Sequence, residues 1–112
     1  MNISIKATHV DLTPSVKQYV DEKIGALEKF LSGILEAKVE LERDRHHHTG
    51  LVFRAEVMLI AGGKLMRAEE RGEDTFAAID LVIPKLKEQM TKFKSKRETL
   101  ERRGARSAKK KR

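Results

Sequence analysis

The chain has 112 residues, the size of one domain, and 39% of them are hydrophobic, which is enough for one core. It has no cysteine, which excludes disulfides and thiolate metal ligands, and its one tyrosine and four phenylalanines are too few for base stacking to be the main way of binding nucleic acid. Residues 1–84 carry 11 Lys and Arg against 14 Asp and Glu, whereas residues 85–112 carry 13 against 3, so the positive excess lies at one end and favours a polyanionic partner. A solvated surface helix with a fraying end is the alternative interpretation of this charge run.

The first half of the chain predicts a strand, a helix and two further strands. Polar and apolar residues alternate over 2–7, as in a half-buried strand. Thr13-Pro14 suits the N-cap and first position of a helix, and Ser32-Gly33 ends it. Alternation returns over 36–45 and 51–61, on either side of a polar turn. The apolar stripe of the helix is expected to be Val16, Val20, Ile24, Leu27 and Leu31.

The second half predicts a hairpin and a second helix. Gly62-Gly63 is a tight hairpin signal, and it precedes a short strand over 64–71. Residues 72–74 then end the sheet and cap a helix whose apolar residues recur three and four positions apart. Because the next two positions of this stripe are charged, the packed part of the helix should end near Lys94. The predicted stripe is Phe76, Ile79, Ile83, Leu86, Met90 and Phe93.

This order of elements predicts an α+β fold, β-α-β-β-β-α. We expect a four-stranded antiparallel sheet with two helices packed on one face, because each element has a single apolar side. Strand residues such as Glu40, Arg54 and Glu56 should face water on the other side. Residues 1–101 should form the single domain, and residues 102–112, RRGARSAKKKR, a basic and disordered tail. The apolar runs are too short to span a bilayer and no signal peptide is visible, which predicts a cytoplasmic protein.

The lysines of the second helix form the candidate RNA-binding surface. At 100° per residue, Lys85, Lys92, Lys96 and Arg103 fall close together, on a ridge about 130° from the centre of the apolar stripe. Lysine ridges suit a sugar-phosphate backbone because their long side chains reach phosphates without needing a fixed geometry. Lys87 and Lys94 flank the apolar stripe on the opposite edge of that helix. Lys17 and Lys23 lie on either side of the apolar stripe of the first helix.

Catalytic and metal sites are not indicated. The three adjacent histidines at 46–48 cannot all point into one tetrahedral site, so we interpret them as a polar turn; a metal site with His9 as a distant ligand is the alternative. Gly62-Gly63 lacks the following helix of a phosphate-binding loop. We therefore predict no enzyme, no cofactor, no metal and no small-molecule substrate. A metal-assisted RNA hydrolase that uses the histidine turn is the enzymatic alternative.

Two segments resemble the ribosome hibernation promoting factor family, which includes the ribosome-associated inhibitor A proteins. They are MNISIKATHVDLTPSVKQYVDEKIGALEKF and RGEDTFAAIDLVIPKLKEQMTKFKSK, and the similarity extends over roughly residues 1–97. The resemblance implies a four-stranded sheet under two parallel helices. It also implies binding to ribosomal RNA of the small ribosomal subunit near the decoding centre, where the protein would block messenger and transfer RNA and preserve idle ribosomes.

The resemblance also assigns residues and partners. RNA contact carries over to Lys17, Lys23, Lys85, Lys92, Lys94 and Lys96, to which we add Lys87, Arg97 and Arg103 as neighbours on the same helix. Ala26 and Glu88 depart from the family, because relatives often carry a basic residue at those positions. We expect a short form without the C-terminal domain that pairs ribosomes in long members, monomeric off the ribosome and in contact with no membrane. A general double-stranded RNA-binding or ribosomal protein is the alternative function.

Overall fold

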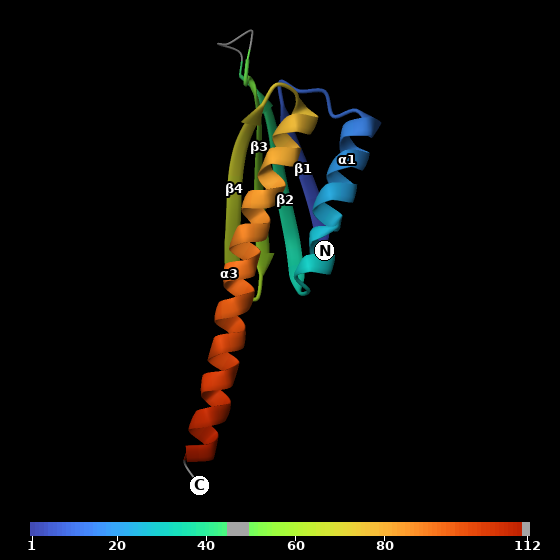
Figure 1. The fold of residues 1–112 in the computed structure, drawn as a ribbon. Helices are drawn as coiled ribbons and strands as arrows, with labels where there is room; N and C mark the ends of the chain where they lie inside the picture. Colours follow the sequence, from blue (N-terminus) through green and yellow to red (C-terminus); the bar gives the residue numbers. More distant parts are fainter. Residues whose placement is uncertain (45–49, 111–112) are drawn as a thin grey trace.

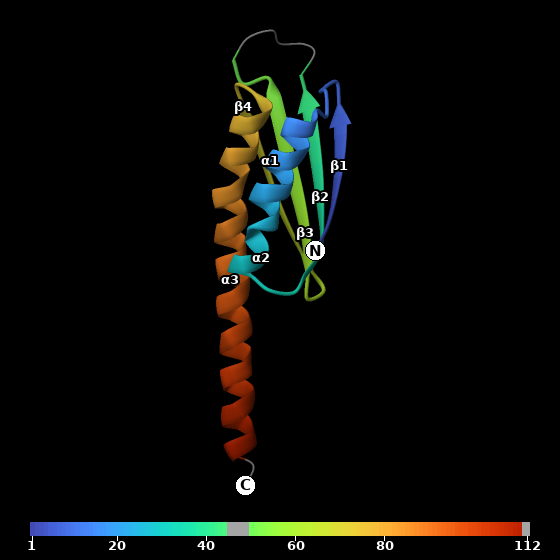
Figure 2. The ribbon, with the colours of Figure 1, turned by 90° about the vertical axis from the view of Figure 1, so that its right-hand side faces the viewer.

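The computed structural model describes the backbone of residues 1–44 and 50–110 and the side chains of residues 1–44 and 50–95, so the histidine turn at 46–48 lies outside the described residues. The strands form one sheet in the order β1-β2-β3-β4. Figure 1 and Figure 2 show the helices side by side on one face of this sheet, which confirms the predicted α+β fold. The elements are β1 (Asn2–Thr8), α1 (Pro14–Gly25), α2 (Leu27–Phe30), β2 (Ile34–Arg43), β3 (Phe53–Ala61), β4 (Lys64–Gly72) and α3 (Thr75–Lys110).

The sheet is mixed, so the prediction of a wholly antiparallel sheet is wrong for β1. This strand pairs with β2 in parallel, from Asn2 beside Glu36 to Thr8 beside Glu42, whereas β2, β3 and β4 pair antiparallel. The helical segment between β1 and β2 explains the difference. It carries the chain back to the end at which β1 began, and a strand that follows such a crossover runs in the same direction as the first.

Local hydrogen bonds confirm the predicted helix starts and the hairpin. The Thr13 hydroxyl accepts a hydrogen bond from the Val16 N–H at 3.2 Å, and the Asp74 carboxylate accepts one from the Ala77 N–H at 2.7 Å. Each therefore satisfies a backbone donor that has no partner within its helix. Gly62-Gly63 has φ of +55° and +75°, the positive values that a two-residue hairpin of this kind requires.

The core confirms the predicted stripe of the first helix but shifts that of α3. Phe76 is 37% exposed, and its ring packs edge-on against Tyr19 with centroids 5.0 Å apart. The fully buried Ala78 and Val82 take its place in the core. At 100° per residue, the buried stripe is centred about 40° nearer to Lys85 than predicted. The buried residues of α3 are Ala78, Ile79, Val82, Leu86 and Met90.

The first helix is broken at Ala26, where the sequence predicted one helix to Leu31. Ala26 follows Gly25, which disfavours a helix by about 1 kcal/mol relative to alanine. The Ala26 N–H bonds the carbonyl oxygens of Glu22 and Ile24, which closes α1 before α2 begins. Ala26 itself keeps helical backbone angles, with φ of −64° and ψ of −22°, so α2 follows directly from α1.

The last helix continues beyond the sheet. α3 runs to Lys110, past the predicted end of packing at Lys94, and Figure 1 shows the extension passing the lower end of the sheet. A helix satisfies its own backbone hydrogen bonds and needs no strand beside it. The backbone over 102–110 is thus helical where the sequence predicted a disordered tail, and the division of domain from tail after residue 101 stays a prediction. None of the helices over the described residues is long and apolar enough to cross a membrane.

Candidate nucleic-acid interface

The lysines of α3 lie on two opposite flanks of the helix, as predicted. Lys85 contacts Glu70 of β4, whereas Lys87 lines a groove beside α1 and α2. The helical period places Lys92 on the flank of Lys85 and Lys94 on the flank of Lys87. The two rows therefore belong to two different surfaces, one along the edge of β4 and one between the helices.

Carboxylates partly neutralise the row along β4. The Lys85 ammonium is hydrogen-bonded to the Glu70 carboxylate, and this contact, with the N–H of Arg71, holds the pKa of Glu70 below its usual value. The Lys92 ammonium lies 3.3 Å from the Glu88 carboxylate, one helical turn away. Exposed pairs of this kind add little to stability. They do place negative charge beside each lysine, which weakens its attraction for a phosphate.

The second surface is a groove between α1–α2 and α3, with a volume of about 390 Å³. Its floor is apolar, and three lysine side chains, one each from α1, α2 and α3, surround it. These ammonium groups make it the strongest candidate for binding a phosphate-rich ligand among the described residues. The lining residues are Lys23, Ala26, Leu27, Lys29, Phe30, Ile83 and Lys87.

Sequence reasoning missed Lys29 and Phe30. On one continuous helix, Lys29 would point about 120° away from Lys23 and would lie outside the candidate surface. The turn at Ala26 is tighter than an α-helical turn, because the Lys29 N–H bonds the Ala26 carbonyl oxygen three residues back at 3.2 Å, and both lysines line the same groove. The signal available in the sequence was Gly25 followed by a short basic and aromatic segment, but its effect depends on the turn that the backbone makes there.

Tyr19 connects the two helices that form the groove. Its hydroxyl donates a hydrogen bond to the Asp80 carboxylate of α3. This bond, with smaller contributions from burial and from the negative charges of Asp80 and Asp74, raises the pKa of Tyr19 to about 12. The Lys23 ammonium lies 5.4 Å from the centre of the Tyr19 ring, a cation–π distance. Tyr19 thus ties α1 to α3 and holds Lys23 beside the groove.

The remaining predicted residues extend this picture without joining the groove. Lys17 is exposed on α1, and Lys94 is exposed on α3 beyond Lys87. Lys96, Arg97 and Arg103 belong to the part of α3 whose side chains lie outside the described residues. The structure therefore brings Lys23 and Lys87 together and separates them from Lys85 and Lys92.

The uncovered face of the sheet carries charges that neutralise one another. The Arg54 guanidinium bonds Glu42 at 2.8 Å and Glu40 at 3.0 Å, and the bond to Glu42 is the main reason why the pKa of Arg54 is raised. Glu56 lies between Arg54 at 3.4 Å and Arg67 at 2.6 Å. Glu56 lies on the predicted face, but only 8% of it is exposed because the two arginines cover it.

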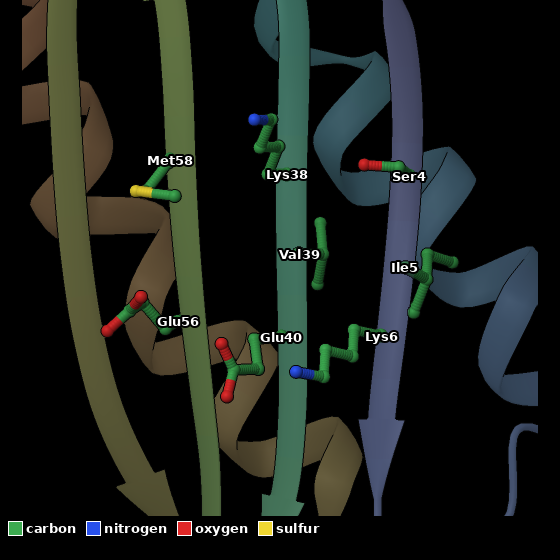
Figure 3. Close-up of a pocket in the computed structure, with 8 residues that line it drawn as sticks. All are labelled: Ser4, Ile5, Lys6, Lys38, Val39, Glu40, Glu56 and Met58. Atoms are coloured by element: carbon green, nitrogen blue, oxygen red, sulfur yellow. The ribbon is translucent and has the colours of Figure 1, made fainter.

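A shallow depression on this face mixes both signs of charge. Figure 3 shows Lys6 extending across β2 toward the Glu40 carboxylate, with Lys38, Glu56 and Met58 around them. Carboxylates within the depression repel phosphate. This face is therefore less suited to a polyanion than the groove between the helices. In the described part of the chain, no group of three or more His, Asp or Glu side chains is placed to hold a metal ion.

Comparison with known proteins places the chain in a family. Residues 3–98 match the family described as Sigma 54 modulation protein / S30EA ribosomal protein, and the chain belongs to that family. It is 31% identical over 96 residues to the ribosome hibernation promotion factor of Bacillus subtilis, and 33% identical over 92 residues to that of Deinococcus radiodurans. These alignments cover 86% and 82% of the chain but 50% and 48% of the relatives, so the chain spans about half the length of the curated relatives it matches. The resemblance to the hibernation promoting factors is confirmed.

Solved structures agree with this assignment. The fold is similar to the Thermus thermophilus Protein Y N-terminal domain, with a TM-score of 0.70 and 32% identity over 83% of this chain and 99% of that chain. A ribosomal subunit interface protein from Coxiella burnetii has a TM-score of 0.75 and 19% identity, over 85% of this chain and 99% of the other. At that identity the second similarity shows the fold alone.

Proposed function

We propose that this chain is a ribosome-associated hibernation factor that binds ribosomal RNA of the small subunit through its helical face. The observation that carries the proposal is the convergence of Lys23, Lys29 and Lys87 around one groove. Lysines bind an RNA backbone by displacing its condensed counterions. The relatives named ribosome hibernation promotion factor support the choice of the ribosome as the RNA-containing partner.

The proposed mechanism is steric. A protein seated at the decoding region occupies the space of messenger and transfer RNA, and this requires tight placement but no catalytic group. The molecule measures 67 Å along its longest axis and 24 Å across, because α3 extends beyond the sheet. This extension carries the basic end of the chain away from the core and toward further RNA. We also propose that the protein acts in the cytoplasm, as a monomer when off the ribosome.

The proposed contacts differ in strength. The three groove lysines supply the main contacts, and Lys17 and Lys94 add charge near the same helical face. Lys85 and Lys92 contribute less, because each already faces a carboxylate. The extension of α3 provides a second group of contacts, which includes Lys96, Arg97 and Arg103.

Cosedimentation with ribosomal particles tests the function. The chain should travel with purified small subunits and intact ribosomes in a sucrose gradient, and it should reduce translation of a reporter messenger RNA in a reconstituted system. Bound messenger and transfer RNA should lower its occupancy. Equal affinity for free duplex RNA, with no preference for small subunits, would contradict the proposal and favour a general double-stranded RNA-binding protein.

A further inference from the structure

Phe30 leaves an aromatic ring exposed in the lysine-lined groove. It is the last residue of α2, and the backbone becomes extended at Leu31, with φ of −139° and ψ of +113°. This turn directs the buried Leu31 into the core and leaves Phe30 outside it, 40% exposed. The ring lies in the same groove as three lysines, above a floor that includes the buried Leu27 and the half-buried Ile83.

The other four aromatic rings have partners. Tyr19 packs against Phe76, Phe53 lies 5.7 Å from the Arg43 guanidinium, and the Lys64 ammonium lies 5.9 Å from the Phe93 ring. Within the described residues, Phe30 is the aromatic side chain with neither a ring nor a cation against its face. An exposed aromatic ring suits the base of a nucleotide, and the cations around it suit the phosphate.

We propose that this groove takes one unpaired nucleotide of the bound RNA. Its base stacks on the Phe30 ring, and its phosphate and the backbone phosphates on either side of it contact the ammonium groups of Lys23, Lys29 and Lys87. The inference rests on the proposed RNA-binding function and adds the kind of RNA element that is bound. Proteins recognise RNA largely through unstacked bases in loops, bulges and ends, which stack on aromatic side chains.

The size and charge of the groove suit this occupant. Its volume of about 390 Å³ lies at the lower end of the range of about 300–1,000 Å³ typical of small-ligand sites. The apolar floor accepts the face of a base, and the three cations favour an occupant that also carries negative charge over a cationic or purely apolar one. The depression on the sheet face has no exposed aromatic ring and contains two carboxylates, so it offers neither part of such a site.

Substitution of the ring separates stacking from charge. Phe30→Leu keeps an apolar side chain and all three lysines, whereas Phe30→Tyr and Phe30→Trp keep an aromatic ring. Loss of one stacked base weakens binding by about 5- to 150-fold. We expect Phe30→Leu to weaken binding to purified small subunits within that range, with the salt dependence unchanged because no phosphate contact is removed. Both aromatic variants should bind as the wild type does.

A footprint on the RNA provides the second measurement. Base-specific chemical probes should show one unpaired base that the wild type protects and Phe30→Leu exposes, while the backbone footprint stays the same. Leu65→Ala is the matched control, because Leu65 is 56% exposed on β4, away from the groove, and its loss should change nothing.

Two results would overturn the inference while the proposed function stands. One is a Phe30→Leu variant that binds small subunits and protects bases as the wild type does. The other is a Phe30→Tyr variant that binds as weakly as Phe30→Leu. If the wild type itself leaves no footprint on small subunits, the proposed function fails and the inference fails with it. Thermal unfolding of each variant shows that the fold is retained.

Discussion

Three lysine charges around the groove should set how strongly binding to the small subunit depends on salt. Replacing Lys23, Lys29 and Lys87 by glutamine lowers the net charge from +7 to +4 and leaves the shape of the groove almost unchanged. Each lost phosphate contact reduces the slope of log affinity against log salt by about 0.7 for a single strand and about 0.9 for a duplex, so the triple variant should lose about 2.1–2.7 from the slope. Between 50 and 200 mM salt, a fourfold change, the wild type should lose about 20- to 40-fold more affinity than the variant.

A control with the same charge shows whether position matters. Replacing Lys6, Lys38 and Lys64 by glutamine also lowers the net charge to +4, but these residues lie on the strands of the sheet. Each variant carries a fluorescent label, and its affinity for purified small subunits is measured by titration at several salt concentrations across that range. The strand variant should keep the wild-type slope, and the pair Lys85→Gln with Lys92→Gln should change it less per residue than the groove variant does. Equal slopes for the two triple variants would refute the groove and leave net charge as the cause of binding.

Four further predictions test the fold, the Tyr19–Asp80 hydrogen bond and the helix extension. Gly25→Ala should raise the free energy of unfolding by up to about 1 kcal/mol, because the added Cβ meets nothing within 4 Å. Gly72→Ala should lower the free energy of unfolding by about 1–3 kcal/mol, because its Cβ would lie 2.5 Å from a backbone nitrogen of α3. Urea unfolding measures both glycine variants, and equal effects of the two substitutions would contradict this packing. The only tyrosine is Tyr19 and there is no tryptophan, so tyrosinate absorbance should show a midpoint near pH 12 in the wild type and near pH 10 in Asp80→Ala. The folded state holds the Tyr19 hydroxyl proton more tightly than the unfolded state, so the hydrogen bond's contribution to stability is complete below pH 10 and is lost as the pH rises toward 12. A midpoint near pH 10 in a wild type that circular dichroism shows to be folded would exclude the hydrogen bond to Asp80. Deleting residues 102–112 removes seven Lys and Arg, and it should keep the unfolding temperature while reducing the salt slope of ribosome binding; an unchanged slope would show that this segment does not contact RNA.

Features set by local periodicity could be predicted from the sequence. The stripe of α1 and the hairpin at Gly62-Gly63 each depend on residues near one another in the chain, and both are confirmed. Strand direction is different, because the alternation of a strand is the same whether its neighbour is parallel or antiparallel. The parallel pairing of β1 follows from the crossover, which only the element order could have indicated.

The phase of α3 shows why packing could not be predicted in full. Counting large apolar residues selected Phe76 and passed over Ala78, whose side chain is small. The end of β4 approaches α3 so closely that a Cβ on Gly72 would lie 2.5 Å from the Ala78 nitrogen and 3.0 Å from the Ala77 Cβ, so only small residues fit where the two elements meet. The size that a position tolerates depends on the distance between two elements.

The groove can attract RNA although residues 1–84 carry a net charge of −3. On the uncovered face of the sheet Arg54 alone bonds Glu40 and Glu42, and on the helices Glu22, Glu28 and Asp80 accept hydrogen bonds from Gln18, the N-terminal ammonium group and Tyr19. The strand carboxylates lie on the far side of the sheet from the helices, and their ion pairs with arginines reduce their effect on a phosphate at the helical face. A phosphate at the helical face therefore experiences the lysines beside it much more strongly than the carboxylates behind the sheet. The local arrangement of lysines around the groove, rather than the total charge of the chain, therefore determines where a polyanion binds.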